Sequence, residues 1–455
     1  MLRDLLTKEL LDIFKTTKFL VAFAAYVVLI PIALYTGQKH YEGRVASYRQ
    51  ALNIYESSLK GSQGSLDVKP QILYRPSNLM VLSRDMMPYF PQGYVISASE
   101  GTQISAGRIP PGLFEKMFGD FDLLFILTAL VSLLSVLVIY DSVSGEKDRG
   151  TLRLVLSYQV PRSKLLLAKY LGPLGASTIC LLAGYLIGLL VLVAFTSFTF
   201  DRELMITFGA VFVMTVLYCS VSLLLGLAVS TFTHKPTNSL LVAIMIWILF
   251  VLVVPRLGVM AAENIVKTDS PETLSLKEEQ VRKSLQEEQN KELKGIFGSP
   301  NYAELRQPIA DRYQQEMARL LSELEDNYMR SRARQEQAAL LLSSVSPVSH
   351  ITASVTEMTN TGYNAMIGLL KDVRLYQSTI ADSVYNKGFR DQIPNVGVKM
   401  IYAPVQLEQV PRFAQTQTSV SERVARSMTS VLILALFNVV LFALTYVKGI
   451  NYDPR

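Results

Sequence analysis

Charged residues are scarce in this sequence, and their scarcity points to its class. Of the 455 residues, 18% are Asp, Glu, Lys or Arg and 50% are hydrophobic, and the mean hydropathy is +0.28. A soluble domain of this length carries more charge on its surface. The composition therefore indicates a membrane protein.

Cysteine and histidine are also rare, which excludes several kinds of site. The two cysteines, Cys180 and Cys219, both fall inside apolar runs, so the sequence offers neither a disulfide framework nor a thiolate metal site. The three histidines, His40, His234 and His350, are far apart, and no H-E-x-x-H or G-x-S-x-G motif is present. We therefore predict that the chain is not an enzyme and has no metal or cofactor of its own.

A phosphate-binding loop is absent as well. The nearest string, residues 145–151, has Thr151 where the motif G-x-x-x-x-G-K-[ST] requires the lysine that contacts the phosphates. The chain is therefore not expected to bind ATP itself, so an ATP-driven function would require a separate subunit.

The sequence does contain six apolar runs of the length that crosses a bilayer as a helix. They are residues 19–35, 123–140, 171–198, 205–232, 239–255 and 428–447, and none of them contains Asp, Glu, Lys, Arg or His. This lack of ionisable groups argues against a proton- or ion-coupled carrier. The transmembrane segments predicted around these runs are residues 19–37, 121–141, 165–198, 205–232, 239–255 and 428–447.

The distribution of basic residues predicts the orientation. Lys147, Arg149, Arg153, Arg162 and Lys164 lie in the loop of residues 142–164, whereas the loop after the third run contains Arg202 as its single basic residue. Cytoplasmic loops carry the excess of Lys and Arg. Residues 142–164 are therefore predicted to be cytoplasmic, as are both termini, including the tail of residues 448–455. The net charge of +6 is explained by this orientation, and no nucleic-acid partner is expected.

Residues 1–18 have apolar positions at helical spacing opposite charged ones, a pattern typical of an amphipathic helix in the membrane interface. A cleaved signal peptide is the competing interpretation. It is disfavoured because Asp4, Glu9 and Asp12 are acidic and no A-x-A cleavage site follows the first apolar run.

Two long segments, residues 38–120 and 256–427, are predicted to lie outside the cell membrane. The first begins with a helix to about Lys60, followed by short extended pieces near residues 72–74 and 94–97. The second has charged helical sequence over residues 275–294 and 302–342, which predicts a helical hairpin. A further mostly helical stretch over residues 349–386 precedes an extended return marked by prolines 394, 404 and 411. The hairpin charges fit either a solvated face or a docking surface for an extracytoplasmic protein partner.

The predicted fold class is therefore an all-α polytopic membrane protein. It has six transmembrane helices, an amphipathic interfacial helix at the N-terminus and a mainly helical extracytoplasmic domain with a hairpin.

The loop of residues 142–164 carries the most informative pattern. It joins two membrane segments and contains a short predicted helix over residues 151–158, which is what a force-transmitting element needs. An ordinary loop made basic by the orientation rule would also fit. The loop resembles that of the ABC transporter type-2 permease family, which typically reads E-x-x-x-G-T-L-x-x-L-L-S-x-P-V-x-R. The matching residues are Glu146, Gly150, Thr151, Leu152, Val155, Leu156, Ser157, Val160, Pro161 and Arg162.

Two departures from the family pattern are visible. Val155 stands at a frequent Leu position, and Tyr158–Gln159 adds one residue to the spacer before Val160 and Pro161. The large outer segments are similar to those of a bacterial subgroup that includes gliding-motility-type permeases.

The resemblance implies a partnership rather than a catalytic role. In that family a cytoplasmic ABC ATPase binds ATP and Mg, two identical or different permease chains form one translocator in the lipid membrane, and the loop is the coupling helix. The ATPase-coupling residues it implies here are Glu146, Arg149, Gly150, Thr151, Leu152, Arg153, Pro161 and Arg162. Glu146 and Arg149 would contact the ATPase, Gly150 and Thr151 would begin the coupling helix, and Arg162 would anchor near the headgroups.

Three functions are compatible with this interpretation. The first is an exporter permease of the bacterial inner membrane for an amphipathic or hydrophobic substrate. The second is an ATP-driven mechanical transmitter that acts on an envelope or cell-surface partner without moving solute. A sensor is disfavoured because the predicted cytoplasmic side contains no signalling domain.

Overall fold

Six helices of the protein are long and apolar enough to cross a membrane, as predicted. They are found in a computed structural model that describes residues 2–61, 70–84, 93–97, 101–105, 122–157, 161–198, 201–380 and 411–451. Their ranges are Thr17–Ser58, Leu123–Asp148, Arg162–Phe195, Arg202–Phe232, Pro236–Ile265 and Val420–Ile450. The chain forms two compact units, residues 1–252 with 346–455, and residues 253–345.

The first unit begins with the short helix α1 (Leu2–Phe14), followed by α2 (Thr17–Gly61), which continues well beyond its apolar run. Helix α2 packs closely on α8 (Arg162–Phe195) because glycines of α8 face it. A Cβ atom at Gly184 would lie 2.7 Å from the carbonyl oxygen of Tyr26, and one at Gly188 would lie 2.5 Å from Cδ1 of Leu34. These two glycines are therefore needed for the close approach of the first and third spans.

The second span is not a uniform α-helix. It consists of α4 (Leu123–Phe125), the π-helical segment η3 (Ile126–Val131), α5 (Ser132–Ile139) and, after a turn, α6 (Ser144–Asp148). Hydroxyl groups line its contacts with other spans. The Tyr218 hydroxyl donates to the carbonyl oxygen of Thr128 at 2.9 Å, and the Trp247 indole N–H donates to Ser132 Oγ at 2.9 Å. The bundle interior is therefore polar in places without being charged there.

The spans differ greatly in how enclosed they are. In α9 (Arg202–Phe232), 67% of the apolar window is buried, whereas the value is 6% for Pro236–Ile265 and 11% for Val420–Ile450. The fifth span consists of α10 (Pro236–Ile248), η4 (Leu249–Val253) and α11 (Val254–Ile265), and the sixth is α17 (Val420–Ile450). Helix α9 is thus the centre of the first unit, while the fifth and sixth spans keep mostly apolar surfaces uncovered.

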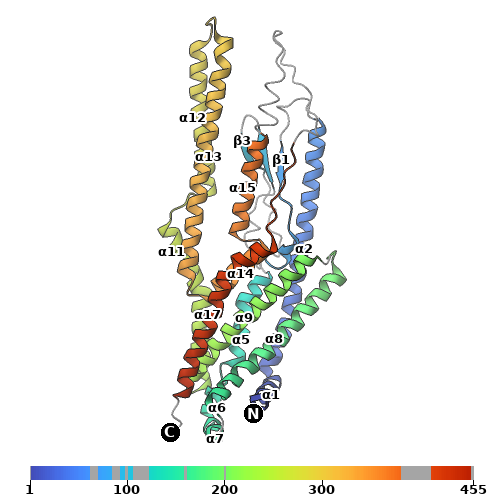
Figure 1. Ribbon diagram of the computed structural model, residues 1–455, viewed down its shortest axis with the longest axis vertical. Coiled ribbons are helices and arrows are strands. Elements are labelled where there is room, and N and C mark those ends of the chain that lie inside the picture. Colours follow the sequence, from blue (N-terminus) through green and yellow to red (C-terminus); the bar gives the residue numbers. More distant parts are fainter. Residues whose placement is uncertain are drawn as a thin grey trace. The chain divides into compact units, whose positions relative to one another are not determined.

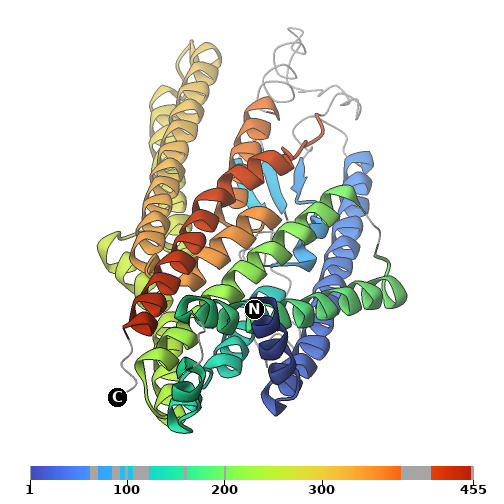
Figure 2. The same cartoon turned by 60° about the horizontal axis from the view of Figure 1, so that its bottom comes forward.

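The two ends of the first unit carry different elements (Figures 1 and 2). Helices α1, α6 and α7 (Thr151–Ser157) and the end of α17 lie at one end. The far part of α2, the strands and α15 (Tyr363–Ile380) lie at the other. Helix α1 and the C-terminal end of α17 are therefore on the same side as α6 and α7 of the loop.

A small antiparallel sheet is the one departure from an all-helical fold among the described residues. Its strands are β1 (Gln71–Leu73), β2 (Gly93–Ser97) and β3 (Gly101–Ser105), in that order, with Ile72 paired to Tyr94. The first two coincide with the extended pieces expected from the sequence, and β3 is additional.

The sheet region packs against α15. The short 3₁₀ helix η1 (Asn78–Val81) contributes Met80, which lies with Ile72 in a separate apolar cluster that includes Val373 and Tyr376 of α15. Burial in this cluster raises the pKa of the Tyr74 phenol to about 12. The first outer segment is thereby joined to sequence about 300 residues further along.

Helix α14 (Pro347–Thr359) belongs to the apolar core that the spans share, although it is too short to cross a membrane. It packs on α9 and α17, and Ile351, Val355 and Met358 are fully buried in the cluster that the spans share. The extended return marked by prolines 394 and 404 lies outside the described residues.

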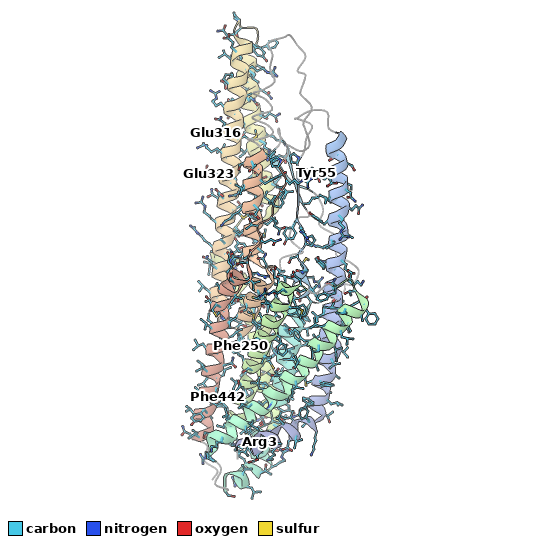
Figure 3. All side chains as sticks on the ribbon, turned by 45° about the vertical axis from the view of Figure 1, so that its right-hand side comes forward. Arg3, Tyr55, Phe250, Glu316, Glu323 and Phe442 are labelled. Atoms are coloured by element: carbon cyan, nitrogen blue, oxygen red, sulfur yellow. The ribbon has the colours of Figure 1, made fainter. Side chains whose placement is uncertain are left out.

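The second unit contains the predicted helical hairpin, formed by α12 (Pro271–Ile296) and α13 (Tyr302–Ser343). Ser270 caps α12 by accepting the amide N–H of Thr273 at 3.2 Å, and Gly298 forms the turn with φ of +86°. Arg312 and Glu292 pair between the two helices. Charged side chains such as Glu316 and Glu323 occur along the hairpin (Figure 3), which explains its low hydropathy.

Candidate functional site

The loop of residues 142–164 folds as two short helices, α6 and α7, at the end of the first unit (Figure 2). The chain turns between them at Gly150, whose φ is +72° and whose amide N–H donates to the carbonyl oxygen of Lys147 at 3.1 Å. A Cβ atom at Gly150 would meet nothing within 4 Å. Glycine is therefore favoured here by the left-handed backbone and not by lack of space.

Helix α6 is fixed to the end of α9 by several hydrogen bonds. The Lys147 ammonium group donates to the carbonyl oxygens of Thr231 at 2.5 Å and Thr233 at 3.0 Å. The backbone amides of Val143 and Ser144 both donate to Ser230 Oγ at 3.0 Å. Because the contacts involve both the backbone and a side chain of α6, a displacement of α6 would be passed on to the fourth span.

A buried ion cluster ties α6 to two further elements. The Lys169 ammonium group of α8 lies 2.7 Å from Glu146 Oε1 and 3.3 Å from Glu9 Oε1 of α1, and it donates to the carbonyl oxygen of Ser142 at 3.0 Å. The Lys169 side chain is 3% exposed. Two carboxylates and a carbonyl compensate the cost of burying this cation. The amphipathic helix, the loop and the third span therefore share one ionic joint.

Sequence reasoning missed Glu9 and Lys169 as site residues. Lys169 lies two positions before the apolar run that begins at residue 171, and this run was delimited by the absence of charge. The available signal for Lys169 was its position in the helical sequence that leads into this run.

Helix α7 presents different faces to the protein and to solvent. Leu152 is 6% exposed and belongs to the main core, whereas Leu154 is 62% exposed. Arg149 and Arg153 are both exposed. Thr151 begins the helix, and its hydroxyl donates to the carbonyl oxygen of Glu146 at 3.4 Å. One side of α7 therefore rests on the bundle, while Arg153 and Leu154 of α7 and Arg149 at the end of α6 are presented outward.

The end of the loop is attached to the third and sixth spans. Pro161 precedes the first turn of α8, and Arg162 donates from its guanidinium group to the carbonyl oxygen of Ile450 at the end of α17. The spacer of residues 158–160, where the sequence departs from the family pattern, lies outside the described residues.

The predicted site residues thus separate into two groups. Glu146, Leu152 and Arg162 make internal contacts, while Arg149, Thr151, Arg153 and Pro161 lie on the exposed side. Gly150 shapes the turn between the two helices. Their roles toward an ATPase remain predictions. In the part of the chain that the structure describes, no group of three His, Cys, Asp or Glu residues is placed to hold a metal.

The fold and this site define a class: a polytopic helical membrane protein whose second and third spans are joined by an anchored two-helix loop. Residues 4–448 match the family described as ABC-2 family transporter protein. The chain therefore belongs to the ABC-2 transporter family and is a membrane permease of that type.

Two relatives are similar over part of the chain. The probable ABC transporter permease protein NosY of Pseudomonas aeruginosa is 31% identical over 125 residues, which are 28% of this chain and 46% of that protein. The protein of the same description from Stutzerimonas stutzeri is 29% identical over 126 residues, again 28% of this chain and 46% of the relative. The matches thus span about half the length of these relatives.

Proposed function

We propose that this chain is the permease subunit of an ATP-driven ABC exporter in the bacterial inner membrane. A separate cytoplasmic ATPase binds ATP and Mg, and the α6–α7 loop receives its movement. The observation that carries the proposal is the two-sided construction of this loop. Its outer side presents Arg149, Arg153 and Leu154, and its inner side is bonded to α1, α8 and α9.

The same construction supports a mechanism. Closure of two ATPase subunits around ATP displaces the α6–α7 loops, and the ionic joint at Lys169 and the bonds of Lys147 pass this displacement to the spans. Rigid connections at both ends make such a movement collective rather than local. The positive-inside pattern supports a cytoplasmic location of the loop and both termini.

The spans support two further parts of the proposal. In the fifth and sixth spans, 6% and 11% of the apolar window is buried within the chain. A second permease chain, identical or different, therefore has apolar surface on which to pack beside the lipid. The hydroxyl-lined contacts around Ser132 and Tyr218 carry dipoles without charge, which suits an amphipathic or hydrophobic substrate.

A second candidate function rests on the α12–α13 hairpin. Its helices contain 26 and 42 residues, and charged side chains lie along them. A long polar hairpin is suited to transmitting the ATP cycle to an extracytoplasmic protein partner without moving solute. Reconstituted vesicles distinguish the two functions, because only the exporter accumulates or expels a substrate in an ATP-dependent way.

The test is copurification with the candidate ATPase, comparing the wild type with the pair Arg149→Ala and Arg153→Ala. Removing two exposed arginines from one docking surface is expected to weaken the complex about tenfold or more. Glu146 is left intact because its carboxylate pairs with Lys169.

The matched control is the pair Lys8→Ala, on α1, and Lys15→Ala, in the turn that follows α1, which removes the same charge from the same end of the unit. Equal weakening by both pairs would indicate non-specific attraction. Unchanged binding by the arginine pair would refute α7 as the docking element.

A further inference from the structure

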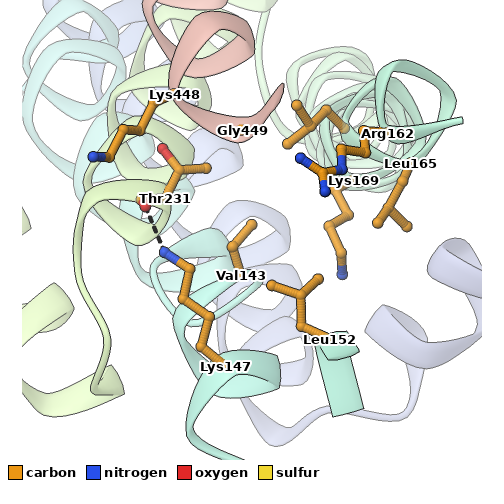
Figure 4. A pocket seen from close by; sticks show the side chains of 10 residues that line it. Val143, Lys147, Leu152, Arg162, Leu165, Lys169, Thr231, Lys448 and Gly449 are labelled. Carbon is orange, nitrogen blue, oxygen red and sulfur yellow. Dashed lines mark hydrogen bonds between the residues drawn. The ribbon is translucent and has the colours of Figure 1, made fainter. Parts of the chain in front are cut away.

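A cleft beside the α6–α7 loop combines positive charge with an apolar wall. It has a volume of about 30 Å³, comparable to one or two water molecules, so a larger group would lie across its mouth. Three cations line it, Lys147, Arg162 and Lys448, together with the ion-paired Lys169 (Figure 4). Its apolar wall includes Leu152, Leu165 and Leu166. None of the residues that line this cleft is acidic.

The three cations come from three different places in the sequence, and the fold brings them to one spot. Lys147 follows the second span, Arg162 opens the third, and Lys448 lies in the last turn of the sixth. Backbone carbonyls orient two of them, since Lys147 donates to Thr231 and Arg162 to Ile450. Lys448 is exposed, and its ammonium group lies 5.4 Å from the ring centre of Phe232.

The position of the cleft matches the headgroup level of a bilayer. Each cation lies where a membrane-spanning helix begins or ends, while the leucines continue into the apolar part. Basic pockets between spans at the cytoplasmic surface are suited to anionic lipid headgroups. A free anion and a lipid phosphate would use the same cations, but a site at this level is always in contact with lipid headgroups.

We propose that this cleft binds the phosphate group of an anionic membrane phospholipid. The phosphate contacts Lys147, Arg162 and Lys448 at the mouth of the cleft, and the acyl chains lie in the bilayer beside the spans. Each lysine or arginine near an anionic lipid surface contributes about 1 kcal/mol, which corresponds to about fivefold in affinity.

The site also adjoins the loop, because Leu152 of α7 forms part of its wall. A bound lipid would therefore hold the inner face of α7 in place. This regulatory consequence rests on the proposed function, whereas lipid binding does not depend on an ATPase.

Native mass spectrometry of the purified full chain tests the binding directly. The protein is titrated with phosphatidylglycerol, with phosphatidylcholine and with inorganic phosphate as separate arms. The wild type is expected to retain phosphatidylglycerol in preference to phosphatidylcholine. The pair Lys147→Gln and Lys448→Gln is expected to bind it about 25-fold more weakly, from two losses of about fivefold each. Lys448→Gln alone replaces an exposed side chain and is expected to weaken phosphatidylglycerol binding about fivefold.

The pair Lys8→Gln and Lys15→Gln serves as the control, because it removes one cation of α1 and one of the turn after it, both outside the cleft. The proposal requires this pair to bind phosphatidylglycerol like the wild type. An equal loss in both pairs, or no preference between the two lipids, would overturn it. Competition of inorganic phosphate at an affinity equal to that of the lipid would show a free-anion site, and the lipid assignment would then be wrong.

Discussion

At the scale of single residues, Lys169 has the most demanding environment in the described part of the site. Its ammonium group is buried between Glu9 and Glu146 and bonded to a backbone carbonyl oxygen. A buried cation is stable only while its partners remain, and the partners in turn depend on it.

Replacement of this lysine is expected to destabilise the protein strongly. Lys169→Met leaves two partly buried carboxylates without their cation, at a cost of about 3 kcal/mol in the free energy of unfolding. Adding Glu9→Gln and Glu146→Gln to the same variant is expected to recover most of the loss. Unfolding in mixed detergent micelles measures both effects. Lys164→Met is the control because Lys164 is exposed. Equal stability of Lys169→Met and Lys164→Met would refute a stabilising role of the ion cluster.

Arg423 shows the same principle at the other end of the bundle. Its side chain is 1% exposed and donates to Glu203 Oε1 at 2.5 Å and to the carbonyl oxygen of Met358 at 3.1 Å. Both Lys169 and Arg423 lie just outside the apolar runs, which are delimited by their lack of charge, although Lys169 falls within the predicted segment 165–198. The sequence did not predict that nearby charges are buried, because partners such as Glu203 and Met358 lie far away along the chain.

At the scale of elements, the turn at Gly150 determines how α6 and α7 follow each other. Its positive φ is unfavourable for residues with a Cβ atom by roughly 1–2 kcal/mol. Because no atom lies near the position of such a Cβ, the whole cost comes from the backbone.

Gly150→Ala is therefore expected to lower the free energy of unfolding by about 1 kcal/mol, and Gly150→Asn by less, since Asn adopts left-handed conformations more readily. Thermal unfolding of the purified protein measures the effect. Gly295→Ala is the control because it lies inside α12 with open space around it, and alanine is favoured there. Shifts in the same direction for both variants would contradict the backbone argument.

The spans and the hairpin could be predicted from the sequence because hydrophobic run length and helical periodicity are local signals. The matching loop residues were also local, so α7 was expected near its observed position. The π-helical segment η3 and the third strand had no such signal. The packing of α14 into the core depends on contacts with α9 and α17 that no local pattern contains.

At the scale of the whole molecule, the account assigns the α6–α7 loop and the α12–α13 hairpin to opposite sides of one membrane. The first belongs to the unit that contains the membrane core, and the second forms a unit of its own. The excess of basic residues in the loop predicts this separation, with the loop in the cytoplasm and the hairpin outside.

Thiol labelling tests this central claim most directly. The two native cysteines are buried, so single variants Arg153→Cys in α7 and Phe297→Cys in the hairpin turn can be labelled with a membrane-impermeant maleimide in sealed vesicles. Arg153 and Phe297 are both exposed. We predict that the two variants react from opposite sides and that the copurifying ATPase protects only Arg153→Cys. Labelling of both from the same side, or no protection of Arg153→Cys in a stable complex, would contradict the account.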